Sequence, residues 1–196
     1  MNGVVIAMAI FGLVGAITPG PVNVLALRYG LHGGFARPLG YVLGASGSYG
    51  ALVWLTGVGA APLLGYPALT QLVRWIGAAY LAYLAWRIAT APVTASDEAL
   101  RHHTASTWRA VVDGMLVQSL NPKAWLVALS GVVLFSEHSS LQRFCTISVI
   151  ACIAGVGCWA VAGRLLKAWL APPHRQRLCN RLLGGVLGFT VLLMLS

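Results

Sequence analysis

Two proline-containing segments interrupt long apolar stretches of this sequence, and both carry residue types suited to holding a small polar solute. They read Thr18-Pro19-Gly20-Pro21 and Asn121-Pro122-Lys123. Proline has no N–H, so each proline leaves the carbonyl four residues earlier without its helical partner, here at Gly15, Ile17 and Gln118. A helix that restarts after such a break exposes N–H groups at the positive end of its dipole. In an apolar surrounding this combination predicts a substrate-binding site built largely from backbone.

Polar side chains flank both breaks and could complete that site. Thr18 and Asn121 are residue types that cap helix N-termini, so we expect Pro19 and Pro122 at the first position of the restarting helices. Further side-chain donors and acceptors come from Asn23, Gln118, Ser119 and Lys123. The alternative is that both prolines only kink packed helices. Two matching breaks favour the binding site.

Two charged residues lie in or near these apolar stretches. Lys123 is the only basic residue well inside one, where a charge is costly. We expect it to hold a substrate carboxylate or to pair with a carboxylate on the protein. Snorkelling, or pairing with carbonyls for structural reasons, is the alternative. Asp113 is expected in the first helical turn near the cytoplasmic face, as a proton acceptor for coupling. A stabilising interaction with the helix dipole alone is equally open.

The residue spacing gives little indication of a metal site, a cofactor site or an enzyme active site. His102 and His103 are adjacent but lack further ligands at metal-site spacing, and the four cysteines form no CxxC pair. We therefore expect reduced cysteines, no metal and no cofactor. The sequence carries no nucleotide-binding motif, and no histidine or acid lies deep in an apolar stretch. An enzyme built inside the membrane is thus not expected.

The elements that must position these residues are membrane helices. Of 196 residues, 58% are hydrophobic and only 9% charged, which is too apolar for a soluble domain. Hydropathy predicts six spans at about 3–27, 39–60, 71–90, 110–135, 142–163 and 181–196. The N-terminus lacks the basic region of a signal peptide, so its apolar stretch is kept as the first span. We expect one transporter domain, 1–196, with halves of about 1–92 and 108–196 joined by a cytoplasmic loop, 93–107.

The net charge of +9 is explained by membrane topology rather than by nucleic-acid binding. Ten basic residues fall on one side of the predicted spans: Arg28, Arg37, Arg87, Arg101, Arg109, Arg164, Lys167, Arg175, Arg177 and Arg181. Arg74 and Arg143 are the two on the other side. Because basic loops stay in the cytoplasm, both termini are expected to face the periplasm.

The two breaks belong to a longer internal match. Residues 12–21 can be laid over residues 115–124 without gaps, which places Pro19 on Pro122. The offset covers three spans, an odd number, so the halves have opposite orientations, as in the inverted repeats of many transporters. Small residues also share helix faces, as in the second span at Gly40, Gly44, Gly47 and Ala51. These faces predict close internal packing, with a homodimer as the open alternative.

With these motifs, the chain resembles the LysE/RhtB family of bacterial amino-acid exporters. The resemblance rests on Thr18–Pro21, on the glycine-rich stretch from Gly30 to Gly40 that leads to Gly44, and on Asn121–Lys123. It implies proton-driven efflux of small amino acids or derivatives across the inner membrane, with the two breaks forming the substrate pathway. Lysine-type exporters have a use for buried acids, and none lies deep in a span here, which favours a neutral substrate.

Two other functions stay open at the sequence level. A divalent-cation exporter of the wider superfamily would need oxygen ligands, chiefly carboxylates, and their lack at mid-membrane depth argues against it. A structural subunit without transport activity is not excluded. In that case polar helix breaks inside the membrane would be an unexplained energetic cost.

Overall fold

The computed structural model describes residues 2–32, 34–60, 67–90, 106–135, 139–170 and 172–195. Within these ranges the backbone forms helices and turns and no strand, which confirms the all-α prediction. The predicted cytoplasmic loop and its His102 and His103 lie almost wholly outside the described residues.

The helices follow the predicted spans, and two of those spans are divided. The bounds are α1 (Asn2–Ile17), α2 (Pro21–His32), α3 (Ala36–Leu55), η1 (Thr56–Ala60), α4 (Pro67–Ala89), α6 (Thr107–Ser119), α7 (Pro122–Phe135), α8 (Leu141–Leu166) and α9 (Pro173–Leu195). The first predicted span is the pair α1 and α2, and the fourth is the pair α6 and α7. Both predicted breaks therefore exist.

Among the described residues, length and composition single out one helix, α8, as able to cross a membrane unaided. The pair α1 and α2 meets the same criteria when taken together, with a bend of 68° at its break. The helix α7 is apolar but shorter. The first break is thus a sharp change of direction inside an apolar segment.

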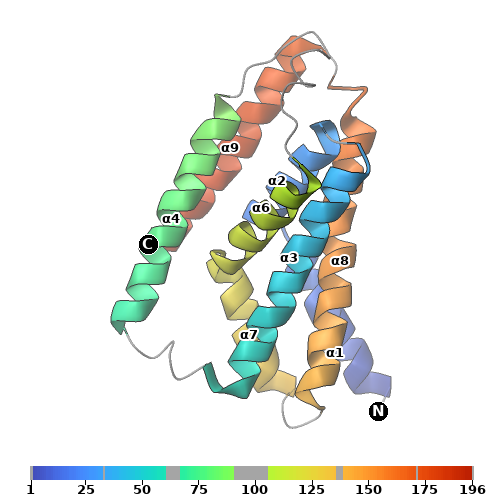
Figure 1. Ribbon diagram of the computed structural model, residues 1–196, viewed down its shortest axis with the longest axis vertical. Helices are drawn as coiled ribbons and strands as arrows, with labels where there is room; N and C mark the ends of the chain where they lie inside the picture. Colours follow the sequence, from blue (N-terminus) through green and yellow to red (C-terminus); the bar gives the residue numbers. More distant parts are fainter. Residues whose placement is uncertain are drawn as a thin grey trace.

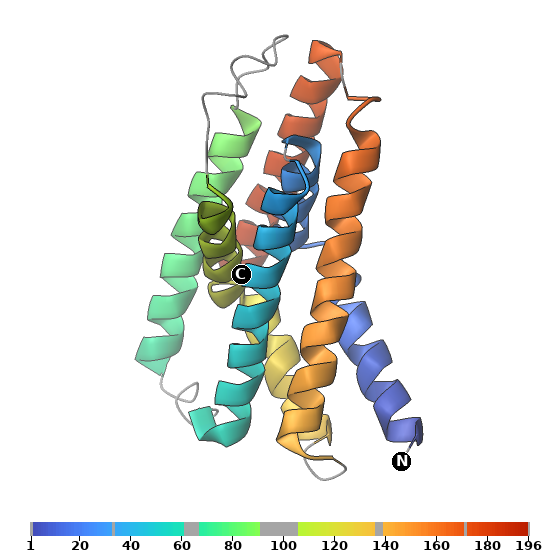
Figure 2. The same cartoon turned by 45° about the vertical axis from the view of Figure 1, so that its right-hand side comes forward.

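The helices pack in three groups that each join the two halves of the sequence. The helix α3 lies between α6 and α8 (Figure 2). The N-terminal part of α8 contacts α1 and its C-terminal part contacts α2. The helices α4 and α9 lie side by side along one edge (Figure 1). Both broken segments are therefore held against long unbroken helices from the opposite half.

Glycines bring the backbones into direct contact where these helices cross. A Cβ atom on Gly44 of α3 would lie 2.1 Å from the Val111 carbonyl oxygen of α6. A Cβ atom on Gly163 of α8 would lie 2.0 Å from the Leu27 carbonyl oxygen of α2. Such contacts leave no room for any side chain.

Only part of the small-residue face predicted for the second span packs closely against another helix. Gly40 and Gly44 pack against α6, whereas nothing lies within 4 Å of a Cβ atom placed on Gly47. Crossing helices approach closely only near their crossing point, which explains why contact is lost toward Gly47. A homodimer through the open part of this face stays a prediction.

Candidate functional site

At the first break the chain leaves helical geometry over three residues. Thr18 Oγ1 donates to the Val14 carbonyl oxygen, so Thr18 closes the end of α1. The next helix, α2, begins at Pro21. The prediction that Thr18 caps the second helix with Pro19 at its first position is therefore wrong. A residue that precedes proline is driven away from helical geometry, so a helix cannot start at Pro19 and continue through Gly20.

Side chains donate to three carbonyls at this break. Asn23 Nδ2 donates to the Ala16 carbonyl oxygen at 2.9 Å and to that of Thr18 at 2.7 Å. Trp159 Nε1 of α8 donates to the Ile17 carbonyl oxygen at 3.0 Å. The expectation of a free Ile17 carbonyl is wrong, because a neighbouring helix supplies the donor that proline removed.

The second break matches its predicted local geometry more closely. Asn121 Oδ1 accepts from the Lys123 backbone N–H at 3.1 Å, and α7 begins at Pro122. Asn121 is thus the expected cap and Pro122 the first helical residue. The Gln118 carbonyl, which was expected to be free, accepts from Asn121 N–H at 3.2 Å. The Ser119 carbonyl accepts from Trp125 Nε1 at 2.8 Å.

Lys123 joins the two breaks. Its Nζ atom donates to the Thr18 carbonyl oxygen at 2.7 Å, across 105 residues of sequence. The same carbonyl also accepts from Asn23. The half-buried ammonium and the α7 N-terminus therefore face the carbonyl end of α1. Positive and negative groups lie together there in a largely apolar region, as recognition of a zwitterion requires.

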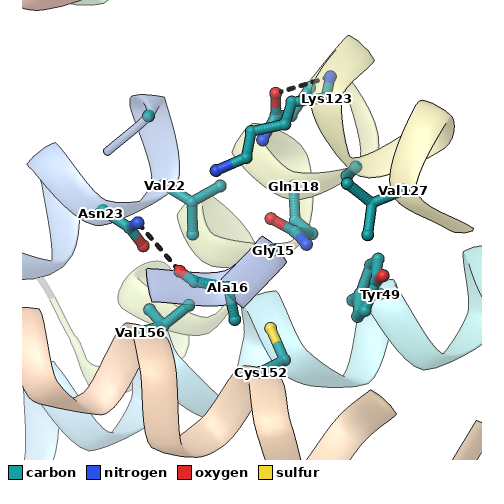
Figure 3. Close-up of a pocket in the computed structure, with 13 residues that line it drawn as sticks. Gly15, Ala16, Val22, Asn23, Tyr49, Gln118, Lys123, Val127, Cys152 and Val156 are labelled. Atoms are coloured by element: carbon teal, nitrogen blue, oxygen red, sulfur yellow. Dashed lines mark hydrogen bonds between the residues drawn. The ribbon is translucent and has the colours of Figure 1, made fainter. Parts of the chain in front are cut away.

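A small cavity of about 30 Å³ lies where the two breaks meet, which is room for roughly one or two water molecules (Figure 3). Six predicted site residues line it: Gly15, Gly20, Asn23, Gln118, Asn121 and Lys123. The other six border the breaks without lining the cavity: Ile17, Thr18, Pro19, Pro21, Ser119 and Pro122.

Sequence reasoning missed seven lining residues, namely Ala16, Val22, Tyr49, Ala124, Val127, Cys152 and Val156. Ala16, Val22, Ala124 and Val127 lie within a turn or so of a break, and their proximity to it could have indicated them. Tyr49 comes from α3, and Cys152 and Val156 come from α8. No local signal marks these three, because only tertiary packing turns them toward the cavity.

A second and larger space adjoins this cavity. It is a groove of about 720 Å³ between α1 and α7, lined by Ala7, Ile10, Phe11, Val14, Gly15, Thr18, Lys123, Val127 and Phe135. Gly15, Lys123 and Val127 line both spaces. Apart from Thr18 and Lys123 at its inner end, the lining residues of the groove are apolar. The polar cavity thus adjoins an apolar groove.

Asp113 lies away from both spaces and has a specific partner. Tyr29 of α2 donates its hydroxyl to Asp113 Oδ2 at 2.6 Å. The Tyr29 ring stacks on Tyr41 of α3 at 4.9 Å between centroids. Tyr41 in turn donates to the Val22 carbonyl oxygen at 3.0 Å. This chain of contacts connects the carboxylate to the helix that follows the first break.

The expected position of Asp113 in the first turn of its helix is wrong. Ser106 caps α6 by accepting from Arg109 N–H at 3.3 Å, so the helix begins at Thr107. The cap places Asp113 in the second turn. A simple helix-dipole role is correspondingly weakened, because that effect fades beyond the first turn.

Within the described part of the chain, no three His, Cys, Asp or Glu side chains gather as a metal site would require. The four cysteines, Cys145, Cys152, Cys158 and Cys179, are free thiols.

Comparison with known proteins gives one family and a consistent set of relatives. Residues 13–196 match the family described as LysE type translocator. A protein of Salmonella paratyphi A (strain ATCC 9150 / SARB42) is 32% identical over 163 residues, which cover 80% of each chain. A protein of Escherichia coli (strain K12) is 30% identical over 172 residues, 85% of each chain. Both are named cysteine/O-acetylserine efflux protein, and no solved structure matches significantly. Because the family match covers nearly the whole sequence, including both breaks, this chain belongs to the LysE family of translocators and is a helical membrane protein.

Proposed function

We propose that the chain is a secondary exporter of small, neutral amino acids or their derivatives across the bacterial inner membrane. The observation that carries this proposal is the meeting of the two helix breaks, where Lys123 Nζ contacts the Thr18 carbonyl oxygen at 2.7 Å. The names of the relatives, which describe efflux of cysteine and O-acetylserine, support the substrate class. Transport without a bound cofactor or enzymatic step fits a site made of backbone groups, uncharged amides and one ammonium group.

A zwitterion would bind by exchanging partners with Lys123. The substrate carboxylate accepts from the Lys123 ammonium near the N-terminus of α7, which draws Nζ away from the Thr18 carbonyl. The released carbonyl then accepts from the substrate ammonium. No carboxylate lines the cavity, so a second positive charge on the substrate would have no partner there. Neutral side chains are favoured for that reason.

We propose that α1 to α4 and α6 to α9 form a 3+3 inverted repeat of six spans. The packing supports it, since α3 contacts α6 much as α8 contacts α1, and α4 pairs with α9. Laying Pro19 over Pro122 also equates Val14 with Val117. Val14 is 58% exposed beside the groove, whereas Val117 is fully buried at 0%. This difference between equivalent positions supports a pathway that is open on one side and closed on the other, as in alternating access.

Asp113 is the proposed proton-coupling residue. It belongs to α6, its partner Tyr29 belongs to α2, and these two helices each adjoin a break. Under the repeat they form the closed, inward half of the pathway. Protonation of Asp113 would remove the negative acceptor of this hydrogen bond and weaken the closure. Coupling would then follow because the inward half opens more readily when Asp113 holds a proton.

The topology proposed for this exporter places both termini in the periplasm. The helices α4 and α8 end, and α6 and α9 begin, at the same end of the molecule (Figure 1). That end carries Arg87, Arg109, Arg164 and Arg175. Basic residues favour the cytoplasmic side of the inner membrane. In this arrangement the groove between α1 and α7 lies in the periplasmic half.

Efflux from cells tests the proposed function directly. Cells that overexpress the chain are preloaded with a mixture of amino acids, O-acetylserine and divalent cations, and the medium is profiled over time. We expect one or more neutral amino acids to accumulate outside faster than in cells that carry an empty vector. Release of cations alone, or no difference from the vector, would overturn the proposal.

A further inference from the structure

We infer that the groove between α1 and α7 receives the side chain of the transported amino acid and selects for apolar side chains of leucine or methionine size. This inference rests on the proposed function, because it assumes that the cavity between the breaks binds an amino acid. It goes further because it assigns side-chain specificity to the groove rather than to the cavity.

The volumes of the two spaces support such a division. The polar cavity, at about 30 Å³, has room for roughly one or two water molecules. The adjoining groove, at about 720 Å³, lies within the size range of ligand pockets. A substrate that places its charged groups between Lys123 and the Thr18 carbonyl can extend its side chain only into space that adjoins them. The groove is such a space.

Gly15 lies at the boundary between the two spaces and packs closely against Val127. A Cβ atom on Gly15 would lie 3.0 Å from Val127 Cγ1, so a larger residue would crowd the junction. Farther along the groove, the Phe11 and Phe135 rings meet edge to face at 5.7 Å between centroids. The groove therefore extends from a charged, hydrogen-bonded inner end to an aromatic far end.

The lining of the groove determines which side chains it favours. Ile10, Phe11, Val14 and Val127 offer only hydrocarbon surface. A substrate arriving from water gains about fourfold in affinity for each methylene group buried there. A polar side chain would lose its hydrogen bonds to water without replacement, and a cationic one would lie near Lys123 without a counter-charge. Leucine has three more carbon atoms than alanine, so its predicted advantage exceeds tenfold.

The position of Lys123 at the inner end of the groove favours the substrate over a lipid chain as the occupant. Three residues, Gly15, Lys123 and Val127, line both spaces. A lipid tail has no group that would bind the ammonium at the inner end of the groove. An amino acid would bind this ammonium through its carboxylate and place its side chain in the apolar part of the groove.

The test compares substrates in proteoliposomes that contain wild type, Val14→Phe or Val161→Phe. Val14 lines the groove and not the cavity, and Val161 is an equally exposed valine on α8 that lines neither space. The readout is the ratio of KM values for alanine and leucine, with serine and lysine as further substrates. We expect wild type to favour leucine at least tenfold, Val14→Phe to lose most of that preference, and Val161→Phe to keep it.

A widened groove provides the converse measurement. Val14→Ala should shift the preference toward phenylalanine, because it enlarges the groove beside Phe11. Transport of all neutral amino acids with equal KM, or a preference that Val14→Phe leaves unchanged, would overturn the inference while the proposed function stands. Absence of any amino-acid transport by the wild type would overturn the proposed function and this inference with it.

Discussion

At the residue scale, the two charged side chains of the pathway have different surroundings and so different tasks. Lys123 lies at the junction of the breaks, with its ammonium on a backbone carbonyl that a substrate could replace. Asp113 lies outside the cavity, held by the Tyr29 hydroxyl from another helix. In the proposed mechanism Lys123 touches the substrate and Asp113 accepts the proton, so separate substitutions should separate binding from coupling.

Asp113→Asn tests the coupling role. The amide cannot titrate, so efflux should lose its dependence on an imposed pH gradient while KM changes less than about threefold. Proteoliposomes at matched and unmatched pH measure both quantities. Asp113→Glu is the control, because it keeps a titratable carboxyl group, and it should retain gradient dependence. Tyr29→Phe removes the hydrogen bond through which the closure is proposed to act, so it should also weaken gradient dependence. Persistent gradient dependence in Asp113→Asn would exclude Asp113 as the coupling group.

Sequence reasoning succeeded for residues whose roles are local. The Asn121 cap and the position of Pro122 follow from neighbouring residue types alone. It failed at Pro19, where a second proline two residues later moved the start of the helix to Pro21. It also missed Tyr49 and Cys152, because the direction of a side chain on a buried helix is set by packing partners distant in sequence.

At the element scale, two broken helices are held in place by unbroken helices from the opposite half. The breaks were predictable because proline acts through the backbone. Which helices would support them was not, because small-residue faces occur on several helices and do not specify a partner. The structure pairs α3 with α6 and α8 with both α1 and α2.

Gly44→Ala tests the crossing of α3 and α6. The added methyl group would lie 2.1 Å from the Val111 carbonyl oxygen, so the helices must separate, at a cost of about 1–3 kcal/mol. Thermal unfolding in detergent, followed by tryptophan fluorescence, should show a lower Tm. Gly47→Ala on the same helix meets no atom within 4 Å and should unfold at or above the wild-type temperature. Equal stability of the two variants would contradict the crossing.

Pro122→Ala tests the second break. Alanine restores an N–H that can compete for the Gln118 carbonyl and extend α6 into α7. We expect transport to fall at least tenfold while thermal stability stays near wild type. The matched control is Pro173→Ala, at the first position of α9, far from either break, which should transport normally. Normal transport by Pro122→Ala would show that the break is not needed for the site.

At the scale of the whole molecule, the proposed transport mechanism depends on two oppositely oriented halves. The topology prediction follows from the ten-to-two distribution of basic residues. Alkaline phosphatase fused after Ser196 should be active, and green fluorescent protein fused at the same position should not fluoresce. Fusions after Thr90 should give the reverse pattern. An inactive phosphatase after Ser196 would overturn the topology and the inverted repeat.

Substrate binding at the meeting of the two breaks can be measured through the KM values of two lysine variants. Lys123→Met keeps much of the side-chain stem but removes the charge, and a charged hydrogen bond contributes about 1.5–3 kcal/mol. The KM for the exported amino acid in proteoliposomes should therefore rise at least tenfold. Lys167→Met, at the exposed end of α8, should stay within twofold of wild type. A wild-type KM in Lys123→Met would contradict the proposed site.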